Sequence, residues 1–184
     1  MTLLLGFAPL VVFCVLVRLS VSLALWIGLA TAFSLTIRAF VETGVLRLLD
    51  AGFTVLFAIL ALTAGFIEPG MPIAWVGMVL ELGLLAIALW SLLVRRPFVG
   101  PYLRAPLDAE HWTAAPVVGL EYRLSWIWAA TFAAMAATDA VILFVHTLSA
   151  NLAAGAGLAA LAGALTYTWQ SGVALGRRLG HHGN

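Results

Sequence analysis

Residues 71–94 read MPIAWVGMVLELGLLAIALWSLLV, a run whose single charged residue is Glu81. The run is long enough to cross a bilayer, because a membrane-spanning helix needs about 20 apolar residues. Residues 125–148 form a second run of this kind and contain one acid, Asp139. A charge in mid-membrane costs about 3 kcal/mol or more, so it persists where it faces other helices, a partner or water. The two acids therefore mark the most informative positions in the chain.

The whole chain has the composition of a membrane protein. Of its 184 residues, 64% are hydrophobic and 9% are charged, whereas soluble domains average about 25% charged residues. The length fits one compact bundle, residues 1–184, without a separate soluble domain. The net charge of +1 argues against nucleic acid as a partner. A single cysteine, Cys14, excludes an intramolecular disulfide and a CxxC site.

Hydrophobic runs between the charges predict an all-α transmembrane bundle with five or six spans. Lone strands are excluded because their backbone groups stay unpaired in lipid. The first run is short and contains Gly6 and Pro9, so it is a full crossing, a half-span or an interfacial helix. No basic residue precedes it, and we expect it to be retained rather than cleaved as a signal peptide. The predicted spans are residues 3–17, 19–37, 51–67, 71–94, 125–148 and 150–175.

The arginines orient the predicted bundle. All nine basic residues are arginines, and eight of them fall in alternate connections, at residues 38–47, 95–123 and 177–178. This positive-inside pattern predicts a cytoplasmic C-terminus and a cytoplasmic loop at residues 95–124. Arg18 is the exception. If the first run does not span, there are five crossings, the N-terminus is outside, and Arg18 snorkels from a shallow position.

The loop between the two acid-bearing runs is the largest predicted segment outside the membrane. Prolines at positions 97, 101, 106 and 116 rule out one long helix. We expect the loop to be ordered against the bundle or a partner, and to offer the contact surface for a partner. The residues predicted for this contact are Arg96, Pro97, Phe98, Tyr102, Arg104 and Trp112.

Glu81 and Asp139 are predicted to form one intramembrane polar centre, with His146 on the same helical face as Asp139. Asp139 and His146 are two turns apart, about 10 Å, so water or Glu81 is needed to link them. One interpretation is a proton or cation relay. The other is a structural hydrogen bond from Asp139 to a neighbouring polar side chain. The candidates for that bond are Thr131, Thr138, Thr166, Thr168 and Gln170.

Small residues recur every four positions in the last run, at Gly155, Ala159 and Gly163. This spacing lets helix backbones approach closely in lipid. We interpret it as helix packing within the bundle, with homodimerisation as the alternative.

The sequence contains no motif for enzymatic chemistry or for a resident cofactor. GxSxG, HExxH and Walker patterns are all missing. His146 is the one histidine near a span, whereas a membrane b-type haem commonly takes two. We therefore expect no enzyme activity, no metal and no cofactor.

Three segments resemble the intracellular septation protein A family of small bacterial inner-membrane proteins. Residues 7–13, FAPLVVF, resemble its opening apolar run, and residues 95–97, RRP, resemble the exit from its central hairpin. Residues 123–129, RLSWIWA, resemble the start of its penultimate helix, with Asp139 where a polar residue is common. Residues 149–153 depart from the family, which has aromatic and lysine residues there. The resemblance implies an inner-membrane, envelope- or division-associated role and supplies no catalytic residues.

Two classes of function follow. The first is a non-enzymatic scaffold or accessory subunit, with membrane lipid and other membrane subunits, or a second copy, as partners. The alternative is a small proton- or ion-coupled transporter using Glu81 and Asp139. Many transporters show internal repeats, and no convincing repeat is visible here, which favours the first class. A membrane enzyme acting on lipids lacks any motif.

Overall fold

The structure, a computed structural model, describes residues 5–145 and 150–180, without the side chains of residues 145, 150–154 and 178–180. Every regular element in these residues is helical, which confirms the predicted all-α class. The long helices are α3 (Val21–Thr43), α4 (Leu48–Leu62), α5 (Ile73–Leu93), α7 (Ala115–Val145) and α8 (Ala150–Gly180). The short elements are α2 (Ala8–Leu16), a π-helical turn η1 (Thr63–Ile67), α6 (Gly100–Arg104) and a 3₁₀ turn η2 (Ala109–His111).

Four of the helices are long and apolar enough to cross a membrane: α3, α4 with its π-helical extension, α5 and α7. The first predicted span is different. Helix α2 has nine residues and is about 14 Å long, which is too short for a hydrocarbon core of about 30 Å. Helix α2 alone is therefore too short for a full crossing, and its length is compatible with the half-span and with the interfacial helix.

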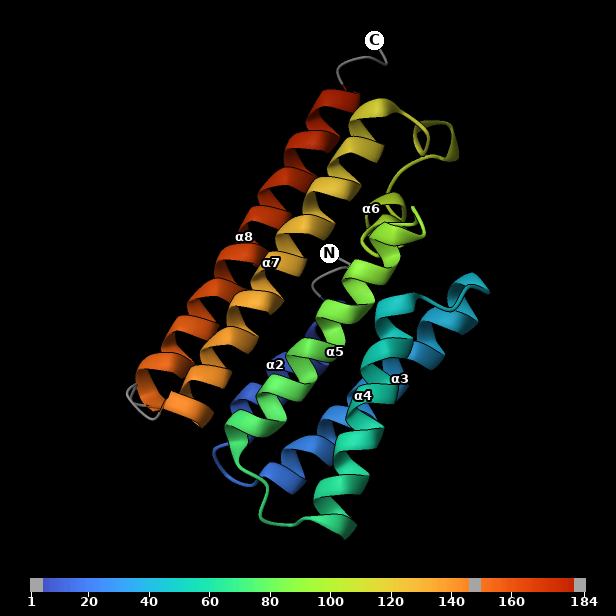
Figure 1. The fold of residues 1–184 in the computed structure, drawn as a ribbon. Coiled ribbons are helices and arrows are strands. Elements are labelled where there is room, and N and C mark those ends of the chain that lie inside the picture. The colour runs from blue at the N-terminus through green and yellow to red at the C-terminus, as the bar shows by residue number, and fades with distance from the viewer. Residues whose placement is uncertain (1–4, 146–149, 181–184) are drawn as a thin grey trace.

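Helix α5 lies in the middle of the bundle, between α7 on one side and α4 on the other. Helix α8 packs on the outer side of α7, while α3 packs against both α4 and α2 (Figure 1). The α3–α4 connection, the loop between α5 and α7 and the C-terminal end of α8 all point to the same end. We call it the arginine-rich end because it carries the arginines at positions 38, 47, 95, 96, 104, 123 and 177.

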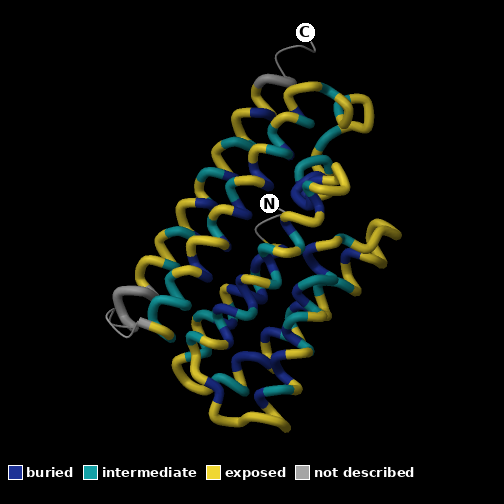
Figure 2. Tube along the Cα trace, viewed as in Figure 1, coloured by how far each residue is buried: buried dark blue, intermediate teal, exposed yellow. Residues whose placement is uncertain are grey.

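The interior is aromatic where α2 meets α4 and α7. The rings of Phe7 and Trp128 stack with centroids 4.0 Å apart and planes 11° apart, and Phe53 packs edge-on against Phe7. All three side chains are fully buried, and Figure 2 shows the buried positions on the inward faces of the helices. The Trp128 indole Nε1 donates to Thr168 Oγ1 at 3.2 Å, which satisfies its polar group and ties α7 to α8.

Helix α7 begins at Ala115, ten residues before the predicted span. Pro116 does not prevent this, because a proline in the first helical turn removes no internal hydrogen bond. Glu121, assigned to the loop from its charge, is fully buried within the helix. The helix therefore begins ten residues before the predicted membrane span, whose bounds stay a prediction. The longer helix also places Asp139 nearer one end of α7 than its middle.

Candidate functional site: a carboxylate pair inside the bundle

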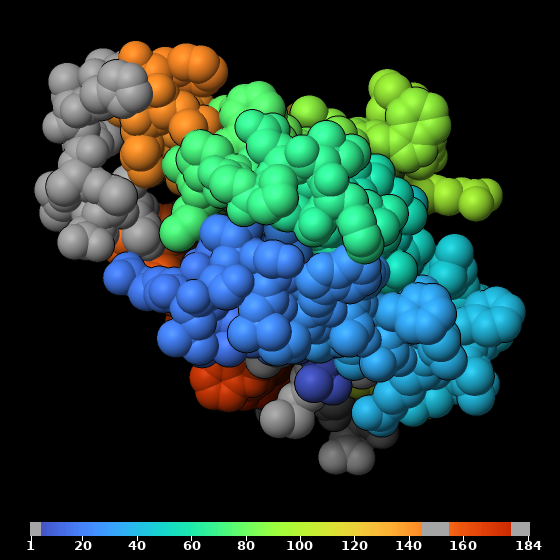
Figure 3. Space-filling model, turned by 90° about the horizontal axis from the view of Figure 1, so that it is seen from below, coloured from blue at the N-terminus to red at the C-terminus, as the bar shows by residue number. Residues whose placement is uncertain are grey.

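A cavity of about 290 Å³ is lined by residues of α2, α5, α7 and α8 and extends toward the end opposite the arginine-rich end. Glu81 and Asp139 both line it, and we call it the carboxylate chamber. Seen from that end, the blue N-terminal helices and green α5 lie against each other, with orange α7 beside α5 (Figure 3). The lining also includes Cys14, Arg18, Gly77 and Thr138.

The two acids lie at similar depth. Glu81 is eight residues after the start of α5, about 12 Å along its axis. Asp139 is six residues before the end of α7, about 9 Å along its axis. Because α5 and α7 run in opposite directions from this end, both carboxylates face the chamber in the same half of the bundle.

Glycine at position 77 makes room for Asp139. A Cβ atom added to Gly77 would overlap Asp139 Oδ2, so a larger residue on α5 would push the carboxylate away. Glu81 lies one turn further along the same helix. Because Gly77 has no side chain, the carboxylates of Glu81 and Asp139 can line the same cavity.

Glu81 is 7% exposed, and its Oε2 atom has no hydrogen-bond partner within the described residues. Four of the five proposed partners of Asp139 are threonines whose hydroxyls donate to carbonyls of their own helices. Within the residues that the structure describes, no hydrogen bond joins the Asp139 carboxylate to a side chain of a neighbouring helix. The hydroxyls concerned belong to Thr131, Thr138, Thr166 and Thr168.

Arg18 lies at the exposed rim of the chamber. It follows α2 in the short connection to α3, and its side chain is exposed. No salt bridge joins Arg18 to either acid in the described structure. The chamber therefore combines two inner carboxylates with one cation at its rim.

The remaining predicted site residues that the structure describes do not line the chamber. His146 lies outside the described residues. Gly155, Ala159 and Gly163 are exposed, and a Cβ at either glycine would meet nothing within 4 Å. Packing of these glycines within the bundle is therefore wrong for the described part of the chain. Helix α8 packs on α7 through a different face, which buries Leu161, Ala164, Thr168 and Leu175.

The predicted partner loop folds back onto the bundle. Phe98 and Tyr102 are 3% exposed, and the Phe98 N–H donates to Ser91 Oγ at 3.2 Å. Pro97 is also buried, so these three positions are packed inside the protein. Arg96 and Trp112 stay exposed and remain available to a partner.

Two polar links hold this loop, and both involve acids that sequence reasoning missed. The Tyr102 hydroxyl donates to Asp50 Oδ1 at 2.7 Å, and burial together with this carboxylate raises the pKa of Tyr102. Arg104 donates to both carboxylate oxygens of Glu121, from Nε at 2.5 Å and from Nη2 at 2.6 Å. The signal available in the sequence was a lone acid within an apolar helical stretch, the same signal that singled out Glu81.

The described helices, four of which are long and apolar enough to cross a membrane, suggest an α-helical membrane protein in which two acids line one cavity. No protein-family model, curated protein or solved structure matches the chain.

Proposed function

We propose that the chain is a small proton- or cation-coupled carrier and that the carboxylate chamber is its coupling site. The observation that carries this proposal is that Glu81 and Asp139, from two helices, line one cavity inside an apolar bundle. Two ionised carboxylates in a medium of low dielectric repel strongly unless a proton or a cation compensates them. A site with this property binds and releases positive charge.

The size and position of the chamber support transport rather than a buried structural pair. Its volume of about 290 Å³ exceeds the roughly 30 Å³ that one water occupies in the liquid. The lining extends to the exposed Arg18 at the end of the bundle that lacks the arginine-rich connections. If the arginine-rich end is cytoplasmic, the chamber loads from the outer side.

Five crossings fit this orientation when α8 is counted as a span in addition to the four apolar helices α3, α4, α5 and α7. Helix α2 then enters the membrane as a half-span, because nine residues do not cross it. Its residue Cys14 lines the chamber, so the half-span supplies one wall of the coupling site. The resemblance to the septation protein family supports a place in a bacterial inner membrane.

The test is ion movement in liposomes that contain only the purified protein and an internal pH-sensitive dye. A cation gradient should drive proton movement in the wild type and much less in Glu81→Gln and Asp139→Asn. Glu68→Gln is the matched control, because it removes an exposed acid near the same end. Equal fluxes in all four proteins, or no flux above protein-free liposomes, would count against a carrier.

A second proposal is a scaffold or accessory subunit, possessing no enzymatic activity and associated with the envelope or division machinery. The exposed small-residue face of α8 favours it, since such faces bind other helices in lipid. The test is purification in mild detergent and mass spectrometry of the proteins that co-migrate. Gly163→Leu should fold normally and release a stoichiometric partner or a second copy, whereas a wild-type protein that migrates alone as a monomer argues against this role.

A further inference from the structure

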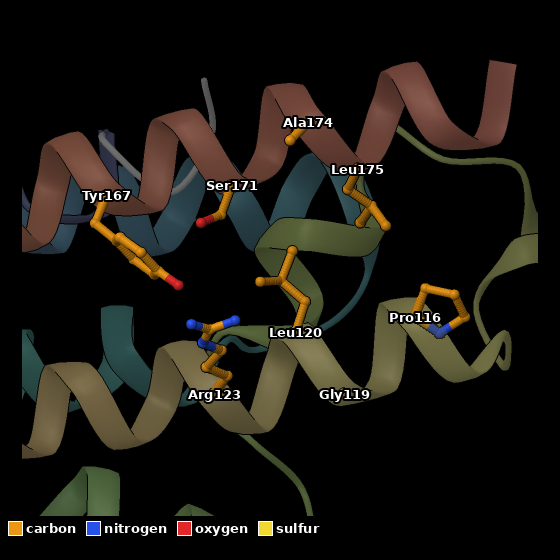
Figure 4. A pocket seen from close by; sticks show the side chains of 8 residues that line it. All are labelled: Pro116, Gly119, Leu120, Arg123, Tyr167, Ser171, Ala174 and Leu175. Carbon is orange, nitrogen blue, oxygen red and sulfur yellow. The ribbon is translucent and has the colours of Figure 1, made fainter. Parts of the chain in front are cut away.

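A second cavity, of about 320 Å³, lies between α7 and α8 at the arginine-rich end. Figure 4 shows Arg123 from α7 and Tyr167 and Ser171 from α8 directed into the same space between the two helices. We propose that this α7–α8 pocket binds the phosphate group of an anionic phospholipid. The pocket shares no residue with the carboxylate chamber, which α7 and α8 also line but nearer the opposite end of the bundle.

The polar groups of the pocket suit a phosphate. The Arg123 guanidinium lies 5.6 Å from the centroid of the Tyr167 ring, so a cation–π contact positions it. No carboxylate in the described part of the chain forms a salt bridge with Arg123. The hydroxyls of Tyr167 and Ser171 likewise have no hydrogen-bond partner among the described residues. One guanidinium and two hydroxyls therefore remain to donate to phosphate oxygens.

The neighbouring acid does not neutralise this site. Glu121, half a turn from Arg123, is fully buried and takes both of its hydrogen bonds from Arg104. The pocket thus keeps a net positive charge, as a site for an anion requires.

Two tryptophans place the pocket at the level of lipid headgroups. Trp126, one turn from Arg123, is 58% exposed, and Trp169, between Tyr167 and Ser171, is 59% exposed. Exposed tryptophans gather at the membrane–water boundary. Helices α7 and α8 have 31 residues each, about 46 Å, so both project beyond a hydrocarbon core of about 30 Å.

A lipid phosphate is favoured over free phosphate because the pocket lies at this boundary and half of its wall is apolar. Pro116, Leu120 and Leu175 supply that part of the wall. Basic pockets between membrane helices on the cytoplasmic side are typical binding sites for anionic headgroups. The bilayer presents such headgroups at this depth at high local concentration, whereas free phosphate must arrive from solution.

The test is the thermal unfolding midpoint of the full-length protein in nanodiscs, titrated from phosphatidylcholine toward phosphatidylglycerol. We expect phosphatidylglycerol to raise the midpoint of the wild type, and Arg123→Gln to need about tenfold more of this lipid for the same shift. Arg96→Gln is the matched control, because it removes an exposed arginine at the same end but outside the pocket. Tyr167→Phe should weaken the response less than Arg123→Gln.

Three results would overturn the proposal. The first is the same lipid response in Arg123→Gln and Arg96→Gln. The second is no response in the wild type. The third is a full response to inorganic phosphate in phosphatidylcholine discs, which would assign the pocket to a soluble anion. If Arg123→Gln does not fold, Ser171→Leu serves instead, since it fills the pocket from α8 and should abolish the response while the charge is retained.

Discussion

The backbone of Gly77 on α5 lies against the carboxylate of Asp139 on α7, so closely that a methyl group at Gly77 would overlap Oδ2. This contact joins the two helices that carry the acids. It also explains why Asp139 shares a cavity with Glu81 instead of turning toward lipid.

Substitution of Gly77 by alanine should displace the Asp139 side chain and lower the free energy of unfolding by about 1 kcal/mol, the lower end of overpacking effects. The displaced group is the end of a short side chain, which can rotate, so the effect stays moderate. In an Asp139→Ala background the penalty of Gly77→Ala should vanish. Thermal unfolding of the two single variants and the double variant measures this coupling.

Gly163→Ala is the control for that experiment, because a Cβ at this position meets nothing within 4 Å. Equal destabilisation by Gly77→Ala with and without Asp139 would contradict the contact.

Loss of the Arg104–Glu121 ion pair should be far more damaging than loss of a surface pair. Arg104→Ala leaves the fully buried Glu121 carboxylate without its partner, which costs about 3 to 5 kcal/mol when both partners are inaccessible. Arg104 is 38% exposed, so water offsets part of this and we expect the lower end of that range. Arg104→Lys should restore little, because lysine does not form the two-armed contact.

Arg38→Ala is the matched control, since it breaks the ion pair between Arg38 and Glu42. The side chain of Arg38 is 66% exposed and that of Glu42 is 54% exposed. Its unfolding midpoint should stay close to that of the wild type. Similar losses in Arg38→Ala and Arg104→Ala would show that the buried pair has no special role.

Tyr102 should make the protein sensitive to alkaline pH. Burial and the Asp50 carboxylate raise the pKa of Tyr102 in the folded protein, whereas an unfolded tyrosine ionises near pH 10. The contribution to stability is therefore complete below about pH 10 and declines as the pH rises above it. Tyrosinate absorbance at alkaline pH should differ between folded and denatured protein, and the difference should shrink in Tyr102→Phe. An unchanged difference would contradict the buried hydrogen bond.

Fusion reporters test the orientation. An enzyme that is active only outside the cytoplasm should be silent when fused after Asn184 and active when inserted at Pro69, because the C-terminal end of α8 and the connection between α4 and α5 lie at opposite ends of the bundle. The arginine distribution predicts this sign. A reporter before the first residue should be active if α2 is a half-span and the chain crosses five times. The reverse pattern at Asn184 and Pro69 would invalidate the orientation.

The helical fold follows directly from the sequence, because in lipid a run of about 20 apolar residues has few alternatives to a helix. The depth of Glu81 and Asp139 was also predictable, since residue counting along two antiparallel helices fixes it. Their shared cavity depends on Gly77, whose importance appears only when α5 and α7 are placed side by side.

A charged residue does not mark a loop when a salt bridge compensates its charge. Glu121 suggested a loop, but its salt bridge with Arg104 lets it lie inside α7, so the helix starts earlier than the apolar run. The small-residue spacing of α8 predicted a packed face and could not say which helix would cover it. In the described structure Gly155 and Gly163 face outward, since α8 uses its leucine-bearing side to meet α7.

The central claim, a water-accessible chamber that attracts cations, is tested most directly through Cys14, the single cysteine of the chain, which lines it. The measurement is the rate at which Cys14 reacts with a small cationic thiosulfonate, divided by its rate with a neutral reagent of the same size, in protein reconstituted in vesicles. This ratio should be high in the wild type and fall in the double variant Glu81→Gln, Asp139→Asn, while Glu68→Gln leaves it unchanged. The same ratio in all three proteins, or no reaction at Cys14 with either reagent, would contradict the account.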